Sequence, residues 1–379
     1  MSRTTGNVLV INGSFHQAFG SVLVLAQSLG VLPVIGIKGS SAFELRFTWK
    51  SFRTIYSVTA FLFAAFYTIF ATCITLTRPV TFNSVVPLTF FTTTAYGVFS
   101  FIRLARKWPK LMQHWEFVEA ILPPYRSFDE KKLLGLEHIL NMVSIIMEAL
   151  SKKKDPLETL FDVQIPLIFT LTKLTWWKAI LSKWFNVVVT FTWSFMDLFV
   201  MVVSIGLASQ FKQINADLQQ MKGKYTSEGF WMLRRIQYRK VVHLVFAVDD
   251  AISQIIFVTF ANNLFFVCVQ IVRSIKEMPS FLNKVYFWFS LTFLITRTVA
   301  VSLFASHIHD ESKKPITVLR AVPNHSWCKE TYRFSEEVIN ETVALSGLKF
   351  FFLTRNVILT VAGAIATYEL VLLQLNTDT

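Results

Sequence analysis

The pattern of apolar and polar residues divides the chain into long stretches that suit a lipid bilayer. Six stretches are close to the roughly 20 residues that a helix needs to cross the hydrocarbon core. Three of them contain no charged residue, and the others contain one each, at Asp197, Arg297 and Glu369. The six stretches are Ile55–Leu76, Val85–Ile102, Phe185–Ala208, Ala251–Val272, Val285–Ser306 and Asn356–Leu375.

Two further apolar stretches are interrupted by polar residues. Ala18–Ile37 carries no charge, but Gln, Gly and Pro residues interrupt it. We therefore expect an interfacial or protein-packed segment there rather than a span. Leu133–Leu150 carries Glu137 and Glu148, which a span tolerates where such residues face other helices or water.

The distribution of Lys and Arg decides the topology. With 133–150 as the third of seven spans and a cytoplasmic N-terminus, the cytoplasmic segments hold 25 Lys and Arg and the outside segments hold 10. This asymmetry agrees with the positive-inside rule, so we predict a cytoplasmic N-terminus and an extracellular C-terminus. The sequons at Asn12, Asn324 and Asn340 then lie inside, where we expect them to stay unmodified.

The same assignment gives the domain organisation of an all-α polytopic membrane protein. Residues 1–53 form a cytoplasmic N-terminal segment with an interfacial helix, and 54–375 form the seven-span domain. Cytoplasmic anchor parts are expected at 103–132, 209–250 and 307–349. In chain order the seven predicted spans are about 55–76, 85–102, 133–150, 185–208, 251–272, 285–306 and 356–375.

The composition excludes an ordinary soluble domain. The 379 residues are 53% hydrophobic and include 38 Phe, with a mean hydropathy of +0.48, whereas soluble domains are nearer about 45–50% apolar. The net charge of +13 is spread between the apolar runs. This spread fits cytoplasmic flanks that face anionic lipid and argues against a nucleic-acid partner.

The sequence lacks the motifs of common enzymes. We find no G-x-S-x-G, H-E-x-x-H or Walker A pattern, so we expect no catalytic activity and no cofactor. The run HIHD at 307–310 contains metal-ligand residue types. We interpret it as a polar turn at the cytoplasmic end of the sixth span and expect no metal site. The orientation and missing D-R-Y and N-P-x-x-Y motifs also argue against a G-protein-coupled receptor.

Aromatic and polar residues lie in the middle or outer part of several predicted spans. Each one alone is explained by helix–helix hydrogen bonds or by an interfacial Trp belt. Together they offer ring faces and hydrogen-bonding groups, which is the pairing that a sugar needs. The predicted ligand-binding residues are Trp193, Asp197, Asn262, Asn263 and Trp288.

The stretch TYELVLLQL resembles the Thr-Tyr-five-residues-Gln-Phe signature of insect gustatory receptors. The matching positions are Thr367, Tyr368, Glu369, Gln374 and Leu375, with Leu where the family usually has Phe. The resemblance extends back along the chain. The region 312–374, with its Trp-Cys and TVALSG motifs, looks like the sugar-sensing branch of that family, and so do 191–215 and 15–37.

The resemblance implies a homotetrameric, ligand-gated, non-selective cation channel, related to the insect odorant receptor channels. It implies seven spans per subunit, a plasma-membrane location in chemosensory neurons and an anchor domain made by the cytoplasmic ends. A sugar would bind among the spans in a pocket open to the outside, and the last helices would line one central pore. Expected partners are the sugar, membrane lipid, further copies of the chain and other gustatory receptor subunits.

The same resemblance assigns the gate to the last helix. Val371, Gln374 and Leu375 are three to four residues apart and share one helix face. Apolar rings on such a face block ions by dewetting. Glu369 lies about 140° from Gln374 around the helix, so we expect it to pack against a neighbouring helix.

Two departures from the family pattern keep other interpretations open. The charged loop runs almost directly into Glu137-His138, which makes the third span short, and Leu375 replaces the usual Phe. The alternatives are a non-conducting or heteromeric subunit of the same family, and a polytopic transporter without a gate. Ionic current from the chain alone separates the channel from both alternatives.

Overall fold

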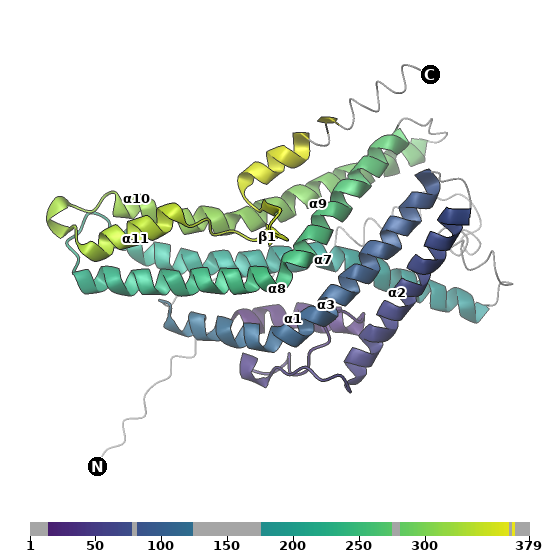
Figure 1. Cartoon of the computed structure of the whole chain (residues 1–379), viewed down its shortest axis with the longest axis horizontal. Helices are drawn as coiled ribbons and strands as arrows, with labels where there is room; N and C mark the ends of the chain where they lie inside the picture. Colours follow the sequence, from purple (N-terminus) through teal and green to yellow (C-terminus); the bar gives the residue numbers. More distant parts are fainter. Residues whose placement is uncertain (1–13, 78–81, 124–175, 275–280, 364–365, 368–379) are drawn as a thin grey trace, which may run out of the picture.

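The computed structural model describes residues 14–77, 82–123, 176–274, 281–363 and 366–367. Within these ranges the regular structure is helical apart from two short strands. Five of the helices are long and apolar enough to cross a membrane (Figure 1). They are α2 (Phe52–Thr77), α3 (Phe82–Ile121), α7 (Trp176–Gln220), α8 (Glu228–Ser274) and α9 (Phe281–Lys313).

The predicted spans are confirmed as helices wherever the structure describes them. Five of the seven each lie within one of these long helices. The predicted third span, 133–150, lies outside the described residues. The last predicted span, 356–375, is described only in its first part, where residues 355–363 and 366–367 are helical.

Four of the helices extend well beyond the predicted spans. α3, α7, α8 and α9 contain 40, 45, 47 and 33 residues. At about 1.5 Å per residue, each is longer than the roughly 30 Å hydrocarbon core. The predicted anchor parts therefore begin as continuations of the spans. The run at 307–310 lies inside α9, so the predicted polar turn was wrong.

The extended helices pack with two short helices into one bundle. α10 (Pro315–Leu319) and α11 (Lys329–Asn340) lie against the ends of α7, α8 and α9 (Figure 1). Arg235 of α8 donates hydrogen bonds to Glu330 and Glu337 of α11, each at 2.8 Å. This charged junction holds α11 along α8.

The segment after Ser14 packs against protein. α1 (Phe15–Ser28) has 14 residues, fewer than a span needs. Its Phe15 ring stacks on Trp115 of α3 with ring centroids 4.1 Å apart. A Cβ on Gly206 of α7 would lie 2.6 Å from the Phe15 ring and 2.8 Å from the Trp115 ring. Glycine at this position therefore allows α1, α3 and α7 to meet closely.

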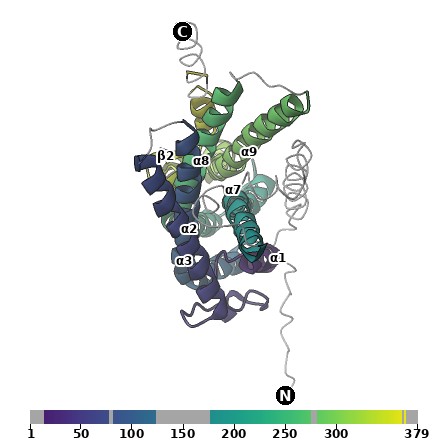
Figure 2. The same ribbon diagram turned by 90° about the vertical axis from the view of Figure 1, so that its right-hand side faces the viewer.

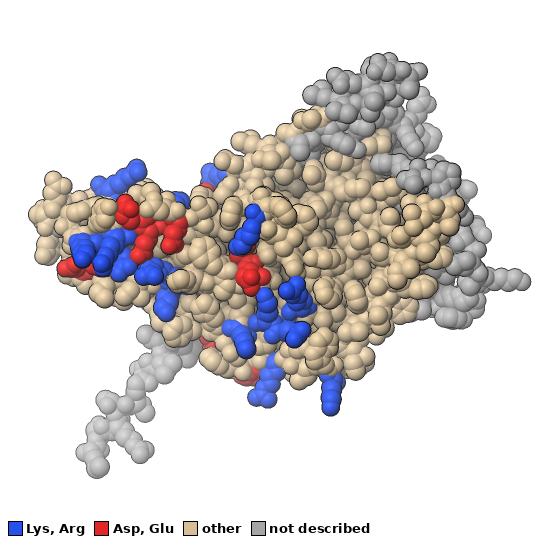
Figure 3. Space-filling model, in the orientation of Figure 1, with Lys and Arg blue, Asp and Glu red and all other residues tan. Residues whose placement is uncertain are grey.

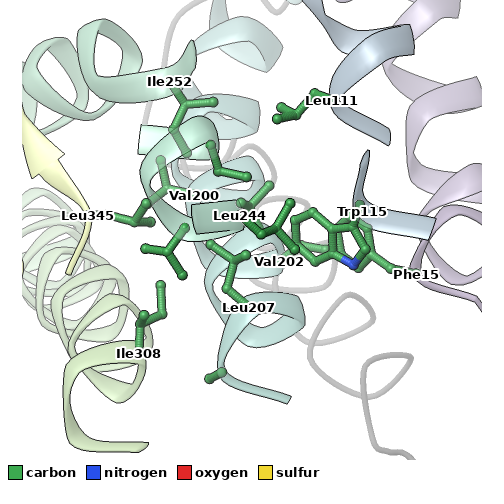
Figure 4. Packing of buried hydrophobic residues seen from close by; sticks show 14 of the residues in the cluster. Phe15, Leu111, Trp115, Val200, Val202, Leu207, Leu244, Ile252, Ile308 and Leu345 are labelled. Atoms are coloured by element: carbon green, nitrogen blue, oxygen red, sulfur yellow. The ribbon is translucent and has the colours of Figure 1, made fainter. Parts of the chain in front are cut away.

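A continuous apolar core joins these helices. Figure 4 shows side chains from α1, α3, α7, α8 and α9 meeting, together with one from the segment before β1. The labelled residues are Phe15, Leu111, Trp115, Val200, Val202, Leu207, Leu244, Ile252, Ile308 and Leu345. Viewed from the side, α7 and α8 lie between the α2–α3 pair and α9 (Figure 2).

The surface separates into a charged part and an apolar part. In Figure 3 the charged side chains gather over α10, α11 and the adjoining ends of α3 and α8, whereas the part over α2 shows none. α2 packs through Tyr67, whose ring stacks on Phe91 and Phe185 with centroids 5.1 and 4.9 Å apart. Its other face exposes apolar side chains such as Leu62 and Phe66, which suit contact with lipid.

A short hairpin leads into the last helix. β1 (Ser346–Gly347) pairs antiparallel with β2 (Phe351–Phe352), and the helix at 355–363 follows. Leu345 and Leu353, which flank the paired residues, are fully buried in the core. The hairpin is thus attached to the bundle just ahead of the last helix.

Candidate functional site

An ion pair lies buried within the apolar part of the molecule. Asp197 of α7 and Arg297 of α9 form this pair, with side-chain exposures of 0% and 6%. A charge away from water is costly unless a partner compensates it. The guanidinium of Arg297 also donates to the backbone carbonyl of Trp193 at 2.9 Å. The pair therefore ties α9 to α7.

Two more side chains complete this arrangement. Asn263 of α8 donates through Nδ2 to Oδ1 of Asp197 at 2.9 Å. Its Oδ1 accepts a hydrogen bond from Nε1 of Trp193 at 3.3 Å. Arg297 lies over the Trp193 ring, 5.1 Å from the ring centroid. We call Trp193, Asp197, Asn263 and Arg297 the buried polar cluster.

Helix spacing explains why these residues meet. Trp193 and Asp197 are four residues apart on α7 and so share one face. That face packs against both α8 and α9, which supply Asn263 and Arg297. Three helices therefore contribute to one hydrogen-bonded set.

The aromatic side of the cluster is more open. Trp193 is half-buried, and its ring lies near Phe90 and Phe266, with centroids 6.4 and 5.1 Å away. Asn262, which precedes Asn263 on α8, accepts a hydrogen bond from the Thr93 hydroxyl at 3.0 Å. Ring faces, an amide and a hydroxyl therefore come from neighbouring positions on α3, α7 and α8.

The structure brings together four of the five predicted ligand-binding residues. Trp193, Asp197 and Asn263 contact one another, and Asn262 is adjacent on α8. Trp288 is 63% exposed and lies nine residues before Arg297 on α9, about 14 Å along the helix. The Trp288 ring lies against that of Phe287, with centroids 5.7 Å apart.

Arg297 is the site residue that the sequence analysis left out. It was noted only as the single base of its span. The sequence did contain a signal for the pair. The fourth predicted span has a single acid and the sixth a single base, and charges within a membrane tend to pair with one another. Asp197, which was predicted as a ligand contact, is fully buried, and its two oxygens contact Arg297 and Asn263.

The predicted gate falls outside the described residues. Tyr368, Glu369, Val371, Gln374 and Leu375 all lie there. Thr367, the first residue of the motif, is exposed and helical, and its hydroxyl donates to the carbonyl of Gly363 at 2.9 Å.

The described residues contain no group of three or more His, Cys, Asp and Glu side chains that could hold a metal ion. The Asp310 carboxylate in the HIHD run instead accepts a hydrogen bond from Nε of Arg355 at 2.8 Å. A cavity of about 420 Å³ lies where the C-terminal ends of α7 and α9 meet α10, and its lining residues are Lys212, Asn215, Ala216, Gln219, Glu311, Lys314, Thr317 and Val318.

Solved structures share this fold. The insect olfactory receptor OR5 from Machilis hrabei matches with a TM-score of 0.68 and 14% identity, covering 96% of this chain and 100% of that one. The same receptor in complex with eugenol matches with a TM-score of 0.66 and 14% identity, covering 95% and 98%. The arrangement of helices is therefore that of an insect olfactory receptor.

The sequence comparisons agree with the fold. The gustatory receptor for sugar taste 64f of Drosophila melanogaster is 44% identical, covering 100% of this chain and 84% of that protein. The gustatory receptor 5a for trehalose from the same species is 36% identical, covering 99% and 88%. The family described as trehalose receptor matches residues 1–379. The chain therefore belongs to the trehalose receptor family, among gustatory receptors for sugars.

Proposed function

We propose that the chain is a sugar receptor that acts as a ligand-gated, non-selective cation channel. The observation that carries the proposal is the combination of two likenesses over nearly the whole chain. Its sequence is similar to sugar taste receptors, and its fold is similar to an insect olfactory receptor that has been solved with a small organic molecule. Both point to a membrane receptor for small molecules.

The sugar binds beside the half-buried ring of Trp193. A sugar ring presents C–H faces that pack on an aromatic ring, and hydroxyls that need hydrogen-bonding partners. Phe90 and Phe266 extend the aromatic surface next to Trp193. Asn262 and Thr93 supply an amide and a hydroxyl nearby. This chemistry fits a small polar ligand better than an apolar one.

The charged members of the buried polar cluster, Asp197 and Arg297, hold the Trp193 ring in place for the sugar. Arg297 lies over Trp193 and binds its backbone carbonyl, and Asn263 accepts from its indole N–H. Asp197 holds both Arg297 and Asn263. Trp288, which is exposed on α9, contributes an aromatic surface at the outer approach to the pocket.

The topology follows from the charge distribution. Seven spans, a cytoplasmic 1–53 segment and an extracellular C-terminus place 25 Lys and Arg inside and 10 outside. The extended ends of α3, α7, α8 and α9, with α10 and α11, form the cytoplasmic anchor. Four subunits assemble around one pore in the plasma membrane of chemosensory neurons, alone or with other gustatory receptor subunits.

The pore is gated by the last helix of each subunit. Val371, Gln374 and Leu375 share the face that lines it. Val371 and Leu375 from the four subunits form apolar rings narrow enough to expel water and close the pore, and the Gln374 amide replaces part of an ion's hydration when the pore opens. The motif residues Thr367, Tyr368 and Glu369 lie on the same helix, with Glu369 against a neighbouring helix.

Calcium entry into cells that express only this chain tests the proposal. We expect entry with one or more common mono- or disaccharides, trehalose included, and none with a non-sugar polyol of similar size. Trp193→Ala should raise the half-activating sugar concentration about five- to thirty-fold, because losing a stacked ring costs about 1–2 kcal/mol. Trp184→Ala, which removes a ring 38% exposed on the same helix, is the matched control. If none of the sugars in the panel evokes calcium entry, the proposal is contradicted.

A further inference from the structure

A buried carboxylate on α8 holds the hairpin that precedes the last helix. Asp249 is fully buried. Its Oδ1 accepts hydrogen bonds from the backbone N–H of Ser346 at 2.6 Å and from the Ser346 hydroxyl at 3.0 Å. Lys349 forms an ion pair with Oδ2. We call residues 345–353 the linker hairpin.

The linker hairpin is held in an unusual backbone conformation. Leu348 and Lys349 have φ values of 51° and 63°, in the left-handed region that residues other than Gly rarely adopt. A Cβ on Gly347 would lie 2.3 Å from the Phe351 ring, so a larger residue at that position would require this ring to move. Such a turn persists only where its surroundings enforce it, and Asp249 supplies the buried contacts that do so.

The hairpin is also attached to α8 by packing. The rings of Phe350 and Phe351 lie 5.9 and 5.5 Å from those of Phe257 and Phe260. The last helix begins at residue 355, two residues after the hairpin ends. The base of the last helix is therefore attached to α8 through the hairpin.

The same helix reaches the proposed sugar site. Asn262 and Asn263 lie 13 and 14 residues after Asp249 on α8, about 20 Å along one uninterrupted helix. α8 thus carries the ligand-site amides at one level and the hairpin attachment at another. A rigid element that touches both sites is a physical route for coupling between them.

We infer that Asp249 is the positioning residue that couples α8 to the gate. Sugar binding shifts α8, and the Asp249–Ser346–Lys349 contacts transmit that shift through the linker hairpin to the last helix. The inference rests on the proposed function, because it takes the last helix as the pore lining.

The coupling role differs from a binding role in the shape of the sugar response. Loss of the Trp193 ring moves the response to higher sugar concentration, and saturating sugar restores it. Loss of Asp249 lowers the response at saturating sugar, because bound sugar no longer moves the last helix. Asp249→Asn keeps the shape of the side chain while removing its charge.

Current per surface-expressed receptor, recorded across a sugar series, tests the inference. For Asp249→Asn and Lys349→Met we expect the ratio of sugar-saturated to sugar-free current to fall about fivefold or more. Lys349→Arg should keep most of it. Asp250→Asn is the matched control, since the neighbouring carboxylate is 78% exposed and pairs with Lys107 at the surface. A wild-type plateau in Asp249→Asn would overturn the inference while leaving the proposed function intact.

Hydrogen exchange supplies a readout that does not depend on conduction. In purified protein, Asp249→Asn should speed amide exchange in residues 345–353 and in the first turns at 355–363, whereas Asp250→Asn should match the wild type. Equal exchange in the two variants would overturn the positioning role. If the wild type carries no sugar-evoked current, the proposed function has failed, and exchange alone then decides whether Asp249 positions the last helix.

Discussion

At the scale of residues, the buried charges explain how three spans are held together. Asp197 and Arg297 compensate each other away from water, and Asn263 satisfies the remaining acceptor on Asp197. A pair of this kind adds little net stability when both members are present, but removing one member leaves an uncompensated buried charge. The arrangement therefore specifies how α7, α8 and α9 fit together.

Removing Arg297 alone should be strongly destabilising. We expect Arg297→Gln to lower the free energy of unfolding by about 3–5 kcal/mol, because Asp197 is then left unpaired in an apolar surrounding. The double variant Asp197→Asn with Arg297→Gln should recover at least half of this loss. Thermal unfolding of the purified proteins in detergent gives the order of stability of the wild type, the single variant and the double variant.

A surface pair provides the matched control for this prediction. Lys107 and Asp250 pair at 3.0 Å with side-chain exposures of 47% and 78%. Lys107→Gln should cost less than about 1 kcal/mol. Equal melting temperatures for Arg297→Gln and Lys107→Gln would show that the buried pair does not hold the helices together.

The sequence predicted three of the four members of this cluster, and their role in ligand binding stays a prediction. Trp193, Asp197 and Asn263 stood out as polar or aromatic residues in apolar stretches. The sequence could not show that Arg297 reaches Asp197 from a helix 100 residues away, since that contact depends on how α7 and α9 pack. The sequence also could not show that Asp197 is fully buried between Arg297 and Asn263.

At the scale of elements, four of the predicted spans lie within helices that extend well beyond them. Arg103 and the basic residues after it read as the end of the second span. In the structure they lie on the exposed face of α3, while Leu104, Trp108 and Trp115 continue the buried face. A pattern averaged around the helix cannot separate these faces. The basic residues from Arg103 onward therefore do not mark the end of the helix.

The close approach of α1, α3 and α7 depends on Gly206. A Cβ there would lie under 3 Å from the Phe15 and Trp115 rings, and both rings are fixed by core packing. We expect Gly206→Ala to destabilise the protein by about 1–3 kcal/mol. The measurement is the melting temperature of the purified protein.

Gly229 offers the control for this substitution. It also lies in a helix, and a Cβ there would meet nothing within 4 Å. Gly229→Ala should be neutral or stabilising by about 0.5–1 kcal/mol, since Gly is the poorer helix former. If the Gly206→Ala and Gly229→Ala variants have the same melting temperature, then α1 is not packed against α7 as described.

At the scale of the whole molecule, charge and apolar surface occupy different parts of the structure (Figure 3). The bundle of extended helix ends with α10 and α11 carries the charged groups, and the part over α2 is apolar. We propose that the charged bundle is the cytoplasmic anchor and that the apolar part lies in the membrane.

Glycosylation tests the orientation. Asn324 and Asn340 are exposed sequon residues near and within α11, and we expect neither to carry a glycan, because we propose that the anchor is cytoplasmic. Leu157→Asn creates a sequon in the segment predicted outside and should add an endoglycosidase-sensitive shift in mobility. A shift that is lost on replacing Asn324 or Asn340 with Gln would reverse the topology.

Substitutions on the last helix test the gate. Val371→Ser or Leu375→Ala widens or wets the apolar ring, so each should raise current in the absence of sugar. Gln374→Ala should change ion selectivity more than sugar potency, because the amide meets ions. Leu372→Ala, about 100° off this face, is the control and should do neither. Unchanged resting current and reversal potential in all three face variants would remove this helix from the pore.

The most direct measurement is the current across a lipid bilayer that contains only the purified chain. We expect cation current that rises when sugar is added to the side facing the extracellular ends of the spans and that falls when the sugar is removed. Trp193→Ala should need a higher sugar concentration for the same current. A bilayer that binds sugar through this protein but stays non-conducting at every concentration would contradict the channel mechanism.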